Sequence, residues 1–202
     1  MNIKVWLMVL VMCCGAVVPA YSQNTPVRIQ RRQIVRMKLP VPDLEVMDQD
    51  GKKMRLYGDL IKDKVVVIGT FYTRCEYVCS GVGRSFSGLQ AKLGNRLGKD
   101  VLLILLTRDP KFDTPEKLKE WARKHGARKG WTLLTGEEKV MQTLIPFFAS
   151  DSVGPVEMHS DMVYIGNDAA NAWLFAGGLS PAAELLQLIE RLIQTQAGKA
   201  GS

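Results

Sequence analysis

The sequence lacks several features that would place it in a common class. Four cysteines in 202 residues are too few for a small disulfide-stapled scaffold. No repeat or low-complexity block appears, and a composition of 47% hydrophobic and 23% charged residues excludes a disordered chain and a multi-span membrane protein. The main apolar run, Val5–Val18, falls short of the about 20 residues that a membrane-crossing helix needs. What is left is one ordinary globular domain behind a short N-terminal extension.

The first 22 residues have the organisation of a secretory signal peptide. Lys4 precedes the apolar run, and Ala20-Tyr21-Ser22 supplies a small-x-small cleavage site after Ser22. Cleavage there would remove Cys13 and Cys14 from an exported protein. Two alternatives stay open: an uncleaved short anchor, and lipid modification of Cys13 or Cys14.

Acidic residues are absent from residues 23–42, so this segment contributes much of the excess of basic over acidic residues that gives the chain its net charge of +7. We predict that residues 23–38 are a basic, flexible linker, with contact to anionic lipid or an acidic partner as the alternative. Nucleic acid is not an expected partner, because no aromatic residue is interleaved with the basic ones. The basic residues are Arg28, Arg31, Arg32, Arg36 and Lys38.

The folded domain is predicted over residues 39–196, followed by a C-terminal tail over 197–202. Strand and helix patterns alternate along it in the order ββ-β-α-β-α-β-α-β-β-α. This α/β order implies a central mixed sheet flanked by helices, as in the thioredoxin-like fold with an N-terminal β-hairpin extension. The predicted strands cover 44–47, 53–56, 64–70, 101–106, 131–134, 162–165 and 172–175, and the helices begin near 79, 115, 137 and 181.

Cys75 and Cys79 follow a buried strand and lie at or just inside a predicted helix start. Residues four apart share one helix face with Cβ atoms about 5–6 Å apart, so both sulfurs could bind one metal ion or form a disulfide. The helix N-terminus and Arg74 are expected to favour the thiolate. Two inert buried cysteines, or one static disulfide, are the structural alternatives.

Three segments together resemble the Sco/SenC family over roughly residues 43–195. The segment 69–79, Gly-Thr-Phe-Tyr-Thr-Arg-Cys-Glu-Tyr-Val-Cys, is similar to the family's Cys-x-x-x-Cys signature, and 109–115 matches its D-P-x-x-D-T-P segment. His159 precedes a strand where the family has its single histidine. Ser80 and Met158 depart from the pattern, which usually has Pro after the second cysteine and Asp before the histidine.

This resemblance implies a periplasmic or membrane-tethered copper protein with a thioredoxin-like fold. Cys75, Cys79 and His159 would bind Cu(I) or Cu(II), a donor set that suits both oxidation states. The protein would deliver copper to the binuclear site of cytochrome c oxidase subunit II or of a related cuproprotein, or prepare the cysteines of that site. An upstream copper donor is then also an expected partner.

The residues leave other roles open. Cys75 and Cys79 could be the redox-active pair of a thiol–disulfide oxidoreductase, or Cys75 the peroxidatic cysteine of a peroxiredoxin-type enzyme. Asp109 is a candidate to orient His159 or tune the metal, with a turn-forming role before Pro110 as the alternative. Asp113 is expected to be a loop or capping residue.

Overall fold

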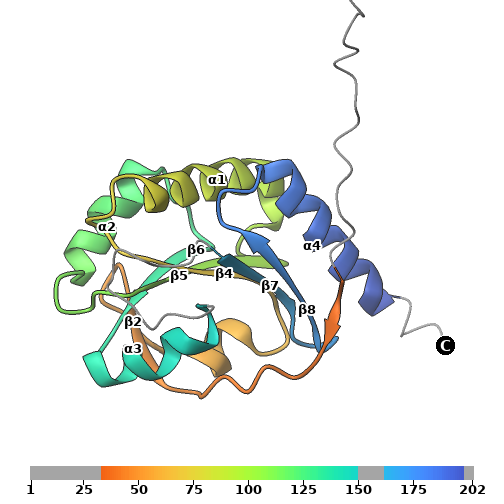
Figure 1. Ribbon diagram of the computed structural model, residues 1–202, viewed down its shortest axis with the longest axis horizontal. Helices are drawn as coiled ribbons and strands as arrows, with labels where there is room; N and C mark the ends of the chain where they lie inside the picture. Colours follow the sequence, from red (N-terminus) through yellow and green to blue (C-terminus); the bar gives the residue numbers. More distant parts are fainter. Residues whose placement is uncertain (1–32, 150–161, 198–202) are drawn as a thin grey trace, which may run out of the picture. The chain divides into compact units, whose positions relative to one another are not determined.

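The two apolar runs predicted as buried strands lie side by side at the centre of a mixed sheet (Figure 1). The computed structural model describes residues 33–149 and 162–197, all within the compact unit Arg32–Ser202. In these ranges one sheet of eight strands has the order β1-β8-β7-β4-β5-β6-β2-β3. The strands are β1 (Val35–Arg36), β2 (Glu45–Asp48), β3 (Lys53–Arg55), β4 (Val65–Phe71), β5 (Val101–Thr107), β6 (Trp131–Thr135), β7 (Met162–Asn167) and β8 (Ala172–Gly177).

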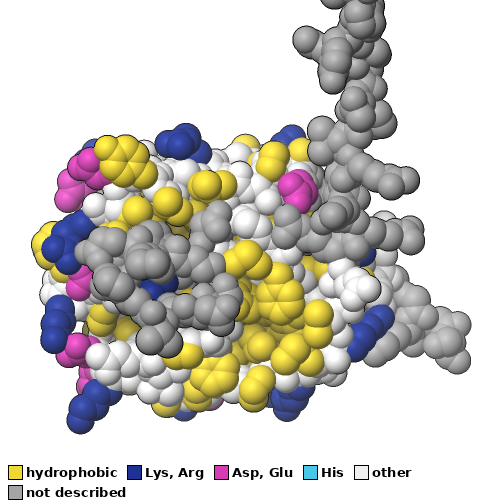
Figure 2. Space-filling view, in the orientation of Figure 1, with side chains coloured by type: hydrophobic (Ala, Val, Ile, Leu, Met, Phe, Trp, Pro, Cys, Tyr) yellow, Lys and Arg dark blue, Asp and Glu magenta, His cyan; other side chains and the backbone are white. Residues whose placement is uncertain are grey.

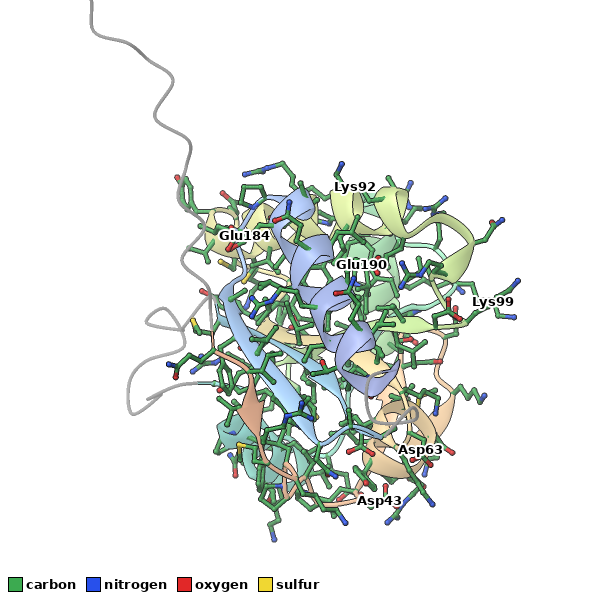
Figure 3. The ribbon with its side chains drawn as sticks, turned by 90° about the vertical axis from the view of Figure 1, so that its right-hand side faces the viewer. Asp43, Asp63, Lys92, Lys99, Glu184 and Glu190 are labelled. Atoms are coloured by element: carbon green, nitrogen blue, oxygen red, sulfur yellow. The ribbon has the colours of Figure 1, made fainter. Side chains whose placement is uncertain are left out.

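Helices cover both faces of this sheet. Helices α1, α2 and α4 pack on one face, and α3 with the turn η1 packs on the other (Figure 1). Figure 3 views the side where α4 crosses the sheet, with Glu184 and Glu190 along its length. The helices are α1 (Val78–Leu93), α2 (Pro115–Lys124), α3 (Glu138–Leu144) and α4 (Ala182–Ala197), and the short turns are η1 (Leu56–Ile61), η2 (Gly94–Arg96) and η3 (Ile145–Phe147).

Strand β4 divides its side chains between two hydrophobic cores, because successive strand residues point to opposite faces. Val65 and Val67 join the core under α1, α2 and α4, whereas Val66 and Ile68 join the core under η1 and α3. Every residue of β4 is buried, as expected for a central strand with helices on both faces.

The carboxyl ends of β4 and β5 and the start of β7 define the edge where the cysteines lie. Strands β4 and β5 are parallel, with Phe71 opposite Thr107, so both chains leave the sheet at the same edge. Strand β7 is antiparallel to β4, with Val163 opposite Gly69, so β7 begins at that edge. Loops at the carboxyl ends of such strands are the usual location of α/β binding sites.

The predicted order of strands and helices is confirmed, including the N-terminal hairpin of β2 and β3. One difference lies in the predicted linker, where β1 pairs with β8 and so joins the sheet. A second is η1, a helical turn of six residues that the sequence analysis left unassigned. Its Leu56, Leu60 and Ile61 are buried, so tertiary packing rather than local pattern accounts for it.

The predicted signal peptide, with Cys13 and Cys14, lies outside the described residues. Among the residues that are described, no helix is long and apolar enough to cross a membrane.

Helix α1 approaches α2 closely at Gly83. A Cβ atom at this position would overlap the imidazole of His125 and lie 2.9 Å from Trp121. His125 ends α2, stacks on Trp121 with ring centroids 3.7 Å apart, and shares a 2.9 Å hydrogen bond with the Trp121 carbonyl. Gly83 therefore allows close helix packing, and α1 remains helical through it.

The Gly83→Ala variant should lower the free energy of unfolding by about 1–3 kcal/mol, because the new methyl group overpacks the contact with His125. Denaturant unfolding would measure the change. Gly88→Ala in the same helix is the control, since its Cβ would lie 3.1 Å from one methyl group of Ala182. Equal stability of the two variants would contradict the packing argument.

Candidate functional site

Cys75 and Cys79 lie at the carboxyl end of β4, both as thiols. Cys75 is in the turn that precedes α1, and Cys79 is the second residue of the helix. The predicted position at or just inside the helix start is therefore correct for Cys79, whereas Cys75 lies three residues before the helix. The two are nevertheless in contact, because the Cys79 backbone N–H donates a hydrogen bond of 3.3 Å to the Cys75 Sγ.

Burial distinguishes the two sulfurs. Cys75 is half-buried, whereas Cys79 is fully buried in the core under α1. Burial raises the pKa of the Cys79 thiol strongly, because the low-dielectric interior disfavours the thiolate. A hydrogen bond to the Tyr72 backbone opposes this shift, and the neighbouring Cys75 adds to it. The expectation that the helix N-terminus favours the thiolate is therefore not met at Cys79, where burial outweighs it.

Arg108 provides positive charge beside Cys79. It follows β5, and its backbone N–H donates to the Phe71 carbonyl at 2.8 Å, which ties it to the end of β4. Burial lowers the pKa of its guanidinium, and the interaction with Cys79 partly offsets that effect. Among the described residues, no hydrogen-bond partner reaches the buried Nη1 of Arg108. The local sequence gives no signal for this role, because Arg108 before Asp109-Pro110 has the pattern of the start of a turn.

Asp113 joins the ends of β4 and β5. Its carboxylate is fully buried and accepts hydrogen bonds from the hydroxyls of Thr73 and Thr107 and, at 3.1 Å, from the Thr73 backbone N–H. Asp113 is therefore more than the loop or capping residue expected from the sequence. The available signal was a threonine after each of the two predicted central strands, each able to donate to an acid on the same edge.

Asp109 lies on the more exposed side of the same edge. Its carboxylate pairs with Arg74, and its backbone N–H donates to the Thr107 hydroxyl at 3.0 Å. The guanidinium of Arg74 also lies 4.3 Å from the ring centre of Phe112. The ion pair with Arg74 thus brings Asp109 close in space to the cysteine turn, and its proposed action on His159 stays a prediction.

His159 and Met158 lie outside the described residues. Of the three predicted copper ligands, the structure therefore describes Cys75 and Cys79. Within the described part of the chain, no group of three or more His, Cys, Asp or Glu residues could hold a metal ion. His125, the other histidine of the sequence, stacks on Trp121, and burial lowers its pKa. The described site is therefore a pair of thiols with a neighbouring cation.

Comparisons with known proteins agree with this architecture. The chain is similar to a SCO1/SenC family lipoprotein from Bacillus anthracis, with 24% identity, a TM-score of 0.65, and coverage of 80% of this chain and 98% of that chain. It is also similar to Bradyrhizobium japonicum ScoI, solved with copper bound, with 19% identity, a TM-score of 0.62, and coverage of 75% of this chain and 98% of that chain. The chain is also similar to BsSco, described as a member of the Sco family of cytochrome c oxidase assembly proteins with a disulfide switch. The identity is 20% and the TM-score 0.60, with coverage of 80% of this chain and 96% of that chain.

These likenesses confirm the predicted thioredoxin-like α/β fold. In addition, the family model described as SCO1/SenC matches residues 37–194, which span most of the chain and both cysteines. The chain therefore belongs to the SCO1/SenC family.

Proposed function

We propose that this protein is an exported copper carrier that binds one copper ion through Cys75, Cys79 and His159. The observation that supports the proposal most directly is the contact between the two cysteines at the carboxyl edge of the sheet, where the Cys79 N–H donates to the Cys75 Sγ. Two thiolates are soft ligands that suit Cu(I), and an imidazole extends the set to Cu(II). His159 precedes the first residue of β7, and β7 begins at this same edge.

Arg108 fits the charge of such a site. Two thiolates and Cu(I) together carry one negative charge, which is costly to bury without a counter-charge. The guanidinium of Arg108 interacts electrostatically with Cys79 and is itself partly buried. Copper would also favour the thiolate form of Cys79, because a thiol that coordinates a metal loses its proton even when it is buried. The copper-bound structure of the Bradyrhizobium relative supports this cargo.

The unequal burial of the sulfurs suits delivery rather than storage. Cys75 is the more accessible ligand, so an incoming ligand from a partner would displace it first, with Cys79 leaving later. We propose that the client is the binuclear copper site of cytochrome c oxidase subunit II or a related cuproprotein, and that a separate donor loads the carrier. The work would take place in the periplasm, with a tether to the outer face of the inner membrane if the N-terminal segment is retained.

A thiol–disulfide oxidoreductase is the second candidate, favoured by the same half-buried and buried pair. The Cys75 thiolate would attack a partner disulfide, and Cys79 would resolve the mixed disulfide. The partner gains two electrons and two protons, and Cys75 and Cys79 lose them as their disulfide forms. Because the disulfide uses both sulfurs, an oxidised protein would not bind copper. Preparing the cysteines of a copper site and loading that site would then be successive activities of one pair.

The chain from residue 23 should bind one Cu(I), and Cys75→Ser and Cys79→Ser should each abolish tight binding. His159→Ala should retain Cu(I) but lose Cu(II), because the imidazole is the harder ligand. Competition with a coloured copper chelator measures this, with Ser80→Ala as the control next to Cys79. Full Cu(I) binding by either serine variant would refute the ligand assignment. Failure of the wild type to bind copper while it reduces a protein disulfide would favour the oxidoreductase.

The two thiols should differ in reactivity when each is the only cysteine of that chain. At pH 7, iodoacetamide should modify Cys75 in Cys79→Ser at least about tenfold faster than Cys79 in Cys75→Ser, because Cys79 is buried and its pKa is raised. The Cys79 rate should still be rising above pH 9, since a raised pKa moves ionisation to higher pH. Mass spectrometry of quenched samples gives both rates, and equal rates would contradict the assigned burial.

Asp113→Asn should destabilise the fold by about 1–3 kcal/mol and weaken copper binding, because the amide cannot accept all the hydrogen bonds from Thr73 and Thr107. Asp109→Asn is the matched control, with an expected loss of about 0–1 kcal/mol, because its ion-pair partner Arg74 is 57% exposed and solvent weakens the pair. Denaturant unfolding and the copper competition assay measure the two effects. If Asp109→Asn proved as harmful as Asp113→Asn, the two carboxylates would not have the distinct roles described above.

A further inference from the structure

An open cleft of about 540 Å³ lies beside the cysteine turn. Thr73 and Arg74 form the wall nearest Cys75, Phe112 and Trp121 provide aromatic surface, and the remaining lining comes from α2. Its volume falls in the range of natural ligand sites, about 300–1,000 Å³. The copper proposal does not use this cleft.

Positive charge dominates the cleft. Lys117, Arg123 and Lys124 line it together with Arg74, against the single acid Glu120. None of the three α2 cations forms an ion pair with another described residue. Their neighbour Lys119, on the same helix but outside the cleft, pairs with Asp50 at 3.0 Å. Three cations of the cleft are thus not neutralised by a described acid.

Phe112 holds two of the cations in place. The Lys117 Nζ lies 3.1 Å from the ring centre, and the Arg74 guanidinium lies 4.3 Å from it. A cation fixed over an aromatic ring has lost part of its side-chain freedom and hydration. The cost of ordering these side chains on binding an anion is therefore reduced.

The spacing of the cations indicates the shape of the ligand. Lys117 and Lys124 are seven positions apart on α2, which separates them by about 10 Å along the helix axis. A single phosphate or carboxylate cannot contact both ends of this row, whereas about three residues of an extended chain can span it. The chain's own residues 23–42 are an unsuitable ligand, because they contain no acid.

We infer that this cleft docks an extended acidic segment of the protein that exchanges copper with Cys75. The exchange rests on the proposed function, but the docking does not. Because Arg74 adjoins Cys75 in the chain, a segment bound in the cleft places its flanking residues next to the more accessible sulfur. Complementary charge also accelerates encounter and selects the partner.

A fluorescent, cysteine-free peptide of about ten residues, with Asp and Glu at alternate positions, is the probe. Fluorescence anisotropy with the reduced protein, without copper, should show binding that weakens as salt increases. The same peptide with Asn and Gln should not bind. Arg123→Glu/Lys124→Glu should weaken binding at least about tenfold. Arg123→Gln/Lys124→Gln should also weaken binding, and it avoids placing acidic side chains at the C-terminal end of α2, where they would destabilise the helix.

The matched control is Lys92→Glu/Lys99→Glu, which changes the net charge equally at two exposed lysines on another side of the molecule (Figure 3). Its affinity for the acidic peptide should stay within about twofold of wild type. Glu120→Gln should tighten binding, because it removes the one acid that lines the cleft.

Equal losses for the cleft pair and the control pair would overturn the inference, as would equal binding of the Asn/Gln peptide. Binding to phosphatidylglycerol vesicles that depends on Arg123 and Lys124, with no peptide binding, would assign the cleft to a membrane instead. Copper stoichiometry is measured on the same variants. Normal copper binding without peptide binding refutes the docking site alone, and the reverse result refutes the copper proposal alone.

Discussion

The buried carboxylate of Asp113 is the constraint on which the site depends. It accepts hydrogen bonds from Thr73, just after β4, and from Thr107, the last residue of β5. A buried acid is tolerated only when its oxygens are satisfied, so these donors and the acid require one another. The result is that two chain segments 34 residues apart in the sequence leave the sheet in a fixed relation (Thr73 to Thr107). The cysteine turn follows Thr73 and Arg108 follows Thr107, so these hydrogen bonds also fix where both begin.

The second constraint is the opposition between burial and charge at Cys79. A fully buried thiol adds apolar packing to the core but resists ionisation, as its raised pKa indicates. Arg108 lies where it would compensate a negative sulfur, and it bears a desolvation cost of its own. In the view of Figure 2, hydrophobic side chains gather over β7 and β8.

The sequence was sufficient for the central strands, the helices and the family, because these rest on local periodicity and on motifs that include Cys75 and Cys79. It was insufficient for β1 and η1, which form through partners distant in the chain. Asp113 was assigned to a loop because its hydrogen-bond donors are brought to it only by parallel strand pairing. Arg108 was missed because its role depends on a cysteine that precedes it by 29 positions.

Trp121 lies between the end of β4 and the basic cleft on α2. Its ring contacts Phe71 at the end of β4, with centroids 4.9 Å apart, and stacks on His125 at 3.7 Å, while it also lines the cleft. An indole in such contacts emits according to its immediate polarity and to quenching by the stacked imidazole. Trp121 is thus an intrinsic optical reporter between the strand that leads to the cysteines and the surface where a partner would bind, once the emission of Trp131 and Trp173 is subtracted.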